Sequence, residues 1–319
     1  MNSAAASRFA ASLLCLSQIG IMHAADKSKA SEFRPINVRV QAGGFGGASA
    51  SDITAVLQSA AGELCRYWPR TQLPSIDVYH RPDHPQTDSR RAAGNRIAIG
   101  LTARDNHWGQ YSFQFAHECC HALINYSNDE RGLTRDRRYA NLWLEESLCE
   151  TASLFTLRAL SRSWLIAPPY AAWRDYAPWF SAYAQERLAM TEHHLPAGTS
   201  FVVWFRANEP ALRQDSTRRD RNTIVAAQLL PIFEKEPRGW GALAFFSRPA
   251  NPNQSLSQHF TKWRSGCPRE FQRFVMKLAA VFEEEAFGFQ RRDGSKSLSI
   301  LRVSCASPDD EFPCNESDQ

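Results

Sequence analysis

The chain has 319 residues, of which 43% are hydrophobic and 22% are charged, and it carries a formal net charge of +4. A charge this small gives no indication of nucleic-acid binding, and the sequence contains no internal repeat or low-complexity tract. The length is enough for one large or two small domains, and nine tryptophans add to ample material for a core.

Residues 1–25 have the features of a secretory signal peptide. Arg8 precedes an apolar run that ends in small residues and is shorter than the ~20 predominantly apolar residues of a bilayer span. We therefore expect cleavage near Ala25, a secreted or periplasmic protein, and no stable membrane insertion afterwards. The alternative is a buried N-terminal helix, while the bulky Leu14 disfavours a lipid anchor on Cys15.

Cleavage leaves seven of the eight cysteines, all except Cys15, in an oxidising compartment where disulfides are expected. Because seven is an odd number, at least one thiol stays free or pairs between chains. We expect a bridge from Cys305 to Cys314, which would close a C-terminal loop, and a bridge from Cys119 or Cys120 to Cys149 is a further hypothesis. A cysteine in an apolar helical segment can also be a small buried hydrophobic side chain, and five lie in such segments: Cys65, Cys119, Cys120, Cys149 and Cys267.

Residue patterns predict a small sheet and one helix before residue 103. Residues 36–41 alternate apolar and polar side chains, as in a half-buried strand, whereas 51–68 repeat apolar residues at helical spacing after a cap at Ser49 or Ser51. The glycine cluster at 43–47 is interpreted as a flexible turn and not a phosphate loop, because no Gly-Lys-Ser/Thr follows it. The predicted elements are strands at 36–41, 75–80 and 96–102, a helix at 51–68 and a loop at 81–95.

The motif His117-Glu118-x-x-His121 predicts a metal site on a helix. Successive residues of an α-helix turn by about 100°, so His117 and His121 project from one face a single turn apart and can reach the same ion. Glu118 lies on the flank of that face, where a carboxylate can take a proton from a water molecule without ligating the metal. Apolar residues across 113–124 follow helical spacing and support this helix.

A second helix, predicted over 141–160, can supply the third ligand that a catalytic zinc site requires. Glu146 and Glu150 lie one turn apart on one face of this helix. Glu146 is the candidate ligand. Glu150 is placed where it can accept the outer N–H of a zinc-bound histidine and fix its tautomer.

These two helices resemble those of the gluzincins, zinc peptidases whose third ligand is a glutamate on a downstream helix. Residues 143–147, Trp-Leu-Glu-Glu-Ser, are similar to the Trp-Leu-Asn-Glu-Gly segment of the gluzincin aminopeptidases, and the Glu146-x-x-x-Glu150 spacing resembles the Glu-x-x-x-Asp of thermolysin-like members. The resemblance covers about residues 95–160. Glu145 replaces the expected Asn, the gap before Glu146 is wider, and no Gly-Ala-Met-Glu-Asn-type segment precedes the motif, so an aminopeptidase is not implied.

The resemblance implies an α+β, zincin-like fold. Residues 34–167 would form a small mixed sheet with the metal-bearing helix, and after Pro168-Pro169 a mainly helical lower subdomain would span 168–290, followed by a polar tail at 291–319. In that family the strand just before the metal helix is a sheet edge that hydrogen-bonds an extended peptide, here residues 97–103.

The resemblance also implies an oxyanion donor, a Tyr or His from the downstream helical part. The sequence does not choose among the candidates, which are Tyr170, Tyr176, Tyr183, His193 and His194. His80, His84 and His107 are interpreted as surface histidines.

The expected function is zinc-dependent hydrolysis of a peptide or protein substrate with Glu118 as general base. One alternative is a degenerate zincin that binds a peptide or envelope partner without hydrolysing it. Another is a cysteine hydrolase that uses Cys149 with His117 or His121. Internal or terminal cleavage and the oligomeric state stay open. Two arginine-rich segments are expected to be solvated, with selection of acidic substrates as the alternative, and they lie at 127–139 and 213–221.

Overall fold

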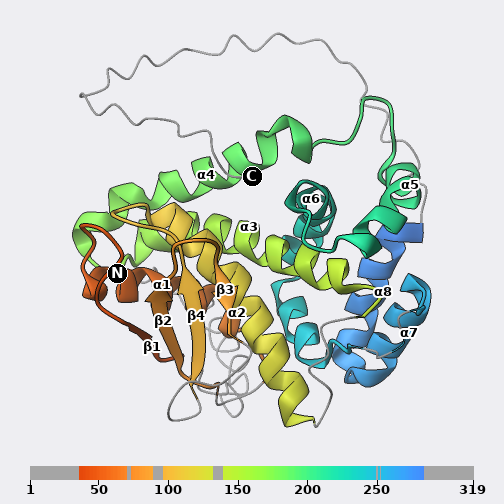
Figure 1. Ribbon diagram of the computed structural model, residues 1–319, viewed down its shortest axis with the longest axis horizontal. Helices are drawn as coiled ribbons and strands as arrows, with labels where there is room; N and C mark the ends of the chain where they lie inside the picture. Colours follow the sequence, from red (N-terminus) through yellow and green to blue (C-terminus); the bar gives the residue numbers. More distant parts are fainter. Residues whose placement is uncertain are drawn as a thin grey trace, which may run out of the picture. The chain divides into compact units, whose positions relative to one another are not determined.

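The computed structural model describes residues 36–69, 73–88, 96–131, 139–248, 251 and 253–283. All of them belong to one compact unit, and their fold is mixed α+β, as predicted (Figure 1). The predicted signal peptide, the Cys305–Cys314 bridge and the polar tail lie outside the described residues. The boundary predicted at Pro168 stays a prediction.

A four-stranded sheet lies at the start of the described chain, with strand order β1-β2-β4-β3. The first three strands in this order are parallel, and β3 runs antiparallel to β4. The mixed sheet therefore agrees with the expectation. The strands are β1 (Val38–Val40), β2 (Ile76–His80), β3 (Gln86–Thr87) and β4 (Ile97–Leu101).

The prediction that residues 97–103 form a sheet edge is wrong. β4 lies between β2 and β3, and all of its residues are buried. The cause is β3, which forms inside the predicted loop 81–95 and places Gln86 opposite Gly100 and Thr87 opposite Ile99. Two residues are too few to show the period of a strand in the sequence. Among the described strands, β3 therefore forms this edge of the sheet.

Helix α1 (Ala50–Cys65) contacts β1 and also packs on α2 (Trp108–Glu130). The Ser49 side chain accepts a hydrogen bond from the backbone N–H of Asp52 at 3.0 Å, which caps α1 as the sequence indicates. Its apolar residues are fully buried at the predicted spacing: Ile53, Val56, Leu57 and Ala60. Helix α2 thus packs against α1 and contacts strands β3 and β4 of the sheet.

Helix α3 (Leu142–Ile166) is the most central element and contacts α1, α2, α4, α5 and α6. It ends directly before the Pro168-Pro169 pair, since neither proline can continue the hydrogen bonding of a helix. Its side chains are buried on nearly every face, as expected of a helix in the core of a protein. Figure 1 shows α3 crossing the unit beside α6.

After residue 168 the described chain is helical, as predicted. Helix α8 buries one apolar face, formed by Phe274, Val275, Leu278 and Phe282. Within the described ranges, no helix has both the length and the apolar character needed to span a bilayer. The α-helices are α4 (Ala177–Ala189), α5 (Phe201–Gln214), α6 (Arg219–Lys235), α7 (Leu256–Gly266) and α8 (Arg269–Glu283), and the 3-10 helices are η2 (Ala171–Tyr176), η3 (Thr191–His193) and η4 (Pro237–Phe245).

Candidate metal centre

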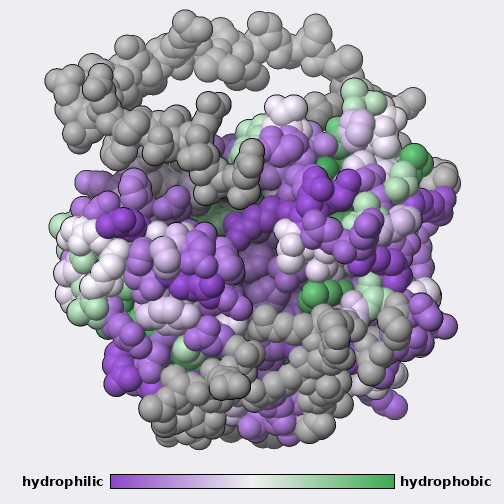
Figure 2. All heavy atoms as spheres, viewed as in Figure 1, coloured by the Kyte–Doolittle hydropathy of each residue, from purple (hydrophilic) through white to green (hydrophobic). Residues whose placement is uncertain are grey.

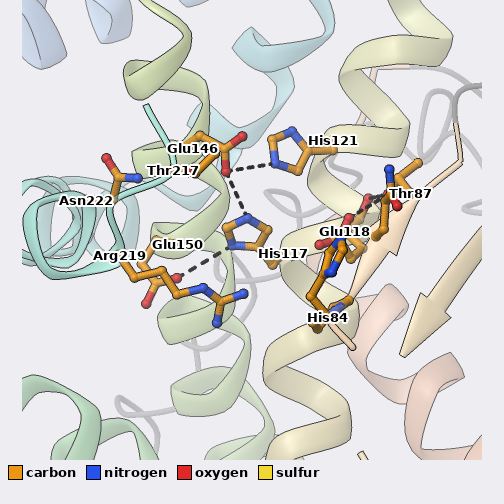
Figure 3. Close-up of a pocket in the computed structure, with 12 residues that line it drawn as sticks. His84, Thr87, His117, Glu118, His121, Glu146, Glu150, Thr217, Arg219 and Asn222 are labelled. Atoms are coloured by element: carbon orange, nitrogen blue, oxygen red, sulfur yellow. Dashed lines mark hydrogen bonds and ion pairs between the residues drawn. The ribbon is translucent and has the colours of Figure 1, made fainter. Parts of the chain in front are cut away.

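The packing of α2 on α3 brings the three predicted metal ligands together. The Nε2 atoms of His117 and His121 each lie 3.3 Å from Oε2 of Glu146 (Figure 3). Their ligand atoms all fall within 4.8 Å of one another, and this is the single group of that kind among the described His, Cys, Asp and Glu residues. Two helices thus bring three potential ligand atoms close enough together to bind one metal ion.

His117 is held by the second carboxylate that the sequence indicates. Oε2 of Glu150 lies 3.5 Å from Nδ1 of His117, on the ring edge away from Glu146. Glu150 is buried, and the Thr223 hydroxyl of α6 donates to its Oε1 at 3.1 Å. Burial alone would raise the pKa of Glu150, but the neighbouring His117 imidazole lowers it overall. Glu150 is therefore an ionised carboxylate beside Nδ1 of His117, and the contact is an ion pair and not a hydrogen bond.

His121 is held by Glu145, a residue that sequence reasoning noted only as a departure from the gluzincin pattern. Oε1 of Glu145 lies 2.8 Å from Nδ1 of His121. Tyr139 donates to Oε2 of Glu145 at 2.5 Å, and Arg248 Nε donates to the same oxygen at 2.7 Å. Burial would raise the pKa of Glu145, but the Arg248 charge and the His121 hydrogen bond hold it well below its usual range.

The donor set fits a divalent transition metal. Each imidazole has a carboxylate beside its Nδ1, so that its Nε2 faces the common position and can bind a metal once its proton is lost. Burial would raise the pKa of Glu146, but the His121 charge and the hydrogen bond from His117 hold it far below its usual value, so this ligand is ionised. Two imidazoles and one carboxylate are a ligand set that suits zinc.

Glu118 lies beside this group without belonging to it, which is the placement predicted for a general base. Its side chain is buried next to strand β3. The Thr87 hydroxyl of β3, 2.7 Å from the backbone oxygen of Glu118 and 3.0 Å from its Oε2, shares its proton between these two acceptors. Sequence reasoning missed Thr87 because it missed β3.

A pocket of about 310 Å³ opens onto the candidate metal centre. Figure 2 shows a hydrophilic hollow near the centre of the visible face, where Figure 1 places α3, α6 and β3. The pocket is lined by His84, Pro85, Gln86, Thr87, His117, Glu118, His121, Glu146, Glu150, Thr217, Arg219 and Asn222. Residues from the sheet edge, from both metal-bearing helices and from the start of α6 therefore share one cavity.

The predicted oxyanion donors do not line this pocket. The Tyr176 hydroxyl accepts from the backbone N–H of Gly109 at 3.1 Å, and ring nitrogens of His193 and His194 lie at hydrogen-bond distance from backbone carbonyls. Backbone groups therefore engage Tyr176, His193 and His194, whereas Tyr170 is exposed at the surface. None of the five is a lining residue: Tyr170, Tyr176, Tyr183, His193 and His194.

Further polar groups that line the pocket come from the loop between β2 and β3 and from the start of α6. His84 lies in that loop, Thr217 precedes α6, and Arg219 and Asn222 belong to its first turn. Figure 3 shows the Arg219 guanidinium pointing into the space beside His117. The only sequence signal for Arg219 is the arginine-rich segment at 213–221.

The described cysteines do not line the pocket. All five described cysteines are buried free thiols, as the hydrophobic interpretation predicts, so the structure does not contain a bridge from Cys119 or Cys120 to Cys149. Burial and a hydrogen bond with Cys120 raise the pKa of Cys149 well above its ordinary value. A nucleophilic cysteine needs an accessible thiolate, and the geometry therefore argues against the cysteine-hydrolase alternative.

The pocket thus combines a metal-binding group, a buried carboxylate outside that group and an arginine. Together they can hold a metal ion, accept a proton from water and stabilise a developing negative charge. Comparison with protein-family models, curated proteins and solved structures found no match for this chain.

Proposed function

We propose that this protein is a zinc-dependent peptidase of the gluzincin type with a zincin-like fold. The observation that carries the proposal is the convergence of His117 Nε2, His121 Nε2 and Glu146 Oε2, with Glu118 in the same pocket. The predicted signal peptide supports action in a secreted or periplasmic setting. The site supports hydrolysis because a carboxylate base accompanies the ligands, which a purely structural metal site does not need.

When bound, a zinc ion would lower the pKa of a water molecule and polarise a carbonyl group. The roles of the protein groups follow from their positions. Glu118 takes the proton of the attacking water and returns it to the leaving amine. Thr87 keeps the Glu118 carboxylate oriented through its hydroxyl. Arg219 and His84 line the pocket and can donate to the oxyanion.

The substrate is a peptide in extended form. Gln86 and Thr87 of strand β3 line the pocket together with the metal ligands, and Thr87 contacts Glu118. An extended peptide that runs along these two residues would place its backbone beside Glu118.

The test has two variants of the purified protein beside the wild type. We expect about one zinc per chain in the wild type by elemental analysis, and a strongly reduced content in Glu146→Ala, which removes a ligand. Glu118→Gln should keep zinc and lose about 10²- to 10⁴-fold in hydrolysis of a peptide library, because the general base is gone.

Each outcome is decisive. A wild type without zinc after reconstitution at neutral pH would overturn the metal site and the peptidase together. Zinc binding with no hydrolysis of any peptide in the library would leave the non-catalytic, peptide-binding alternative. Equal activity of wild type and Glu118→Gln would remove Glu118 from the mechanism.

A further inference from the structure

An ion pair is buried directly behind one of the candidate metal ligands. Nε of Arg248 donates to Oε2 of Glu145 at 2.7 Å, and Nη2 of Arg248 donates to Oε1, so the contact is bidentate. The side chains are only 2% and 1% exposed. Burying two charges costs free energy that their attraction offsets only when the geometry is favourable, and a hydrophobic pair would avoid this cost.

The pair connects to the metal centre through a continuous chain of hydrogen bonds. Oε1 of Glu145 accepts from Nδ1 of His121, whose Nε2 faces Glu146. Nη1 of Arg248 donates to the side chain of Asn125, one turn after His121 on α2. Arg248, which follows η4, therefore fixes groups on both metal-bearing helices.

Both oxygens of the Glu145 carboxylate accept two hydrogen bonds each. Oε2 receives Tyr139 Oη and Arg248 Nε, and Oε1 receives the second arm of Arg248 and His121. The planar fork of a guanidinium sets the plane of a carboxylate, which a single ammonium group cannot do. The Arg248 guanidinium therefore sets the orientation of the Glu145 carboxylate. Glu145 in turn sets the ring plane and the tautomer of His121.

We propose that Arg248 is a positioning residue of the metal centre, acting through Glu145 on His121. This inference rests on the proposed zinc site and extends it to a residue far along the chain. It also gives a reason for Glu145 where the similar aminopeptidases have Asn: the added negative charge is matched by Arg248. A carboxylate behind a histidine ligand typically raises metal affinity by 10- to 100-fold.

The main test is Arg248→Lys, which keeps the positive charge and removes the fork. We expect the zinc dissociation constant, measured by competition with a chromophoric chelator at fixed pH, to rise at least about tenfold. The visible absorption of the cobalt(II)-loaded protein, which reports ligand geometry, should change as well. The matched control is Arg39→Lys, because Arg39 makes a similar two-bond contact to buried Asp77 in the sheet, away from the site.

A second variant guards against misfolding. Glu145→Gln combined with Arg248→Met removes both charges together and leaves no unpaired ion, and it should also weaken zinc binding at least about tenfold because the carboxylate is lost. Thermal unfolding of each metal-free variant separates a fold defect from a site defect. Zinc affinity and cobalt spectrum equal to wild type in the folded variants would overturn the inference. A wild type that binds neither ion would instead overturn the proposed function.

Discussion

At the scale of residues, both histidine ligands and the general base each contact a buried polar neighbour. Glu150 contacts His117, Glu145 contacts His121, and Thr87 contacts Glu118. Such contacts fix side-chain orientation before a substrate arrives, so that less ordering is needed in the reaction. The strength of each contact can be tested by replacing the neighbour and leaving the reacting group unchanged.

Thr87→Val tests the support of the general base. Valine has nearly the same shape but no hydroxyl, so the fold and the zinc content should be unchanged. The rate of peptide hydrolysis should fall about tenfold, the equivalent of one ordinary hydrogen bond of about 1.4 kcal/mol. Thr87→Ser keeps the hydroxyl and should retain activity, and equal rates for both variants would show that the hydrogen bond to Glu118 has no role in the reaction.

At the scale of elements, the site depends on how closely η4 approaches α8. Gly239 of η4 lies against the Phe274 ring, and a Cβ added at Gly239 would lie 2.1 Å from Phe274 Cζ. Phe274 in turn stacks edge-on against Phe233 of α6, with ring centroids 5.0 Å apart. Arg248 follows η4 in the chain, so this aromatic packing helps to place its guanidinium.

Two alanine substitutions distinguish close packing from helix propensity. Gly239→Ala should destabilise the protein by about 1–3 kcal/mol, because a methyl group does not fit against Phe274. Gly62→Ala should stabilise it by up to about 1 kcal/mol, because Gly62 lies inside α1 and its added Cβ would meet nothing within 4 Å. Urea unfolding midpoints measure both effects. Shifts in the same direction would contradict this account of the packing.

At the scale of the whole molecule, metal binding, protonation and folding are linked. Burial would lower the pKa of His121, but the charge of Glu146 and the hydrogen bond to Glu145 raise it well above its ordinary value. Burial would also lower the pKa of His117, but its contacts with the Glu146 and Glu150 carboxylates raise it. Without metal, both imidazoles therefore stay protonated to a higher pH than a free histidine.

The pH dependence of zinc affinity follows from this linkage. A ligand histidine must be neutral, so zinc competes with protons and its apparent affinity should fall as the pH falls through the raised pKa values. We expect a clear loss of affinity already between pH 8 and pH 6, with net proton release on binding. Isothermal titration in buffers of different ionisation enthalpy measures both quantities. A pH-independent dissociation constant would contradict the prediction, and Glu146→Ala provides the baseline without specific binding.

The sequence predicted most of the helices because their apolar spacing is a local property. It failed at β3, whose two residues form a strand only through pairing with β4. It also failed to find the supports at Thr87 and Arg248, which lie 31 and 103 residues from their partners Glu118 and Glu145. No local pattern marks such contacts, since they depend on how separate elements pack.

The sequence by itself determined the relation of His117 to His121 and of Glu146 to Glu150, because an α-helix of 3.6 residues per turn places residues four apart on one face. Only the tertiary structure decided that these two faces meet, that Thr87 of β3 contacts Glu118, and that Arg219 and His84, in place of the predicted tyrosines and histidines, line the pocket. The physical reason is that helical periodicity is fixed by bonds between near neighbours, whereas the meeting of distant segments is fixed by packing of the whole core.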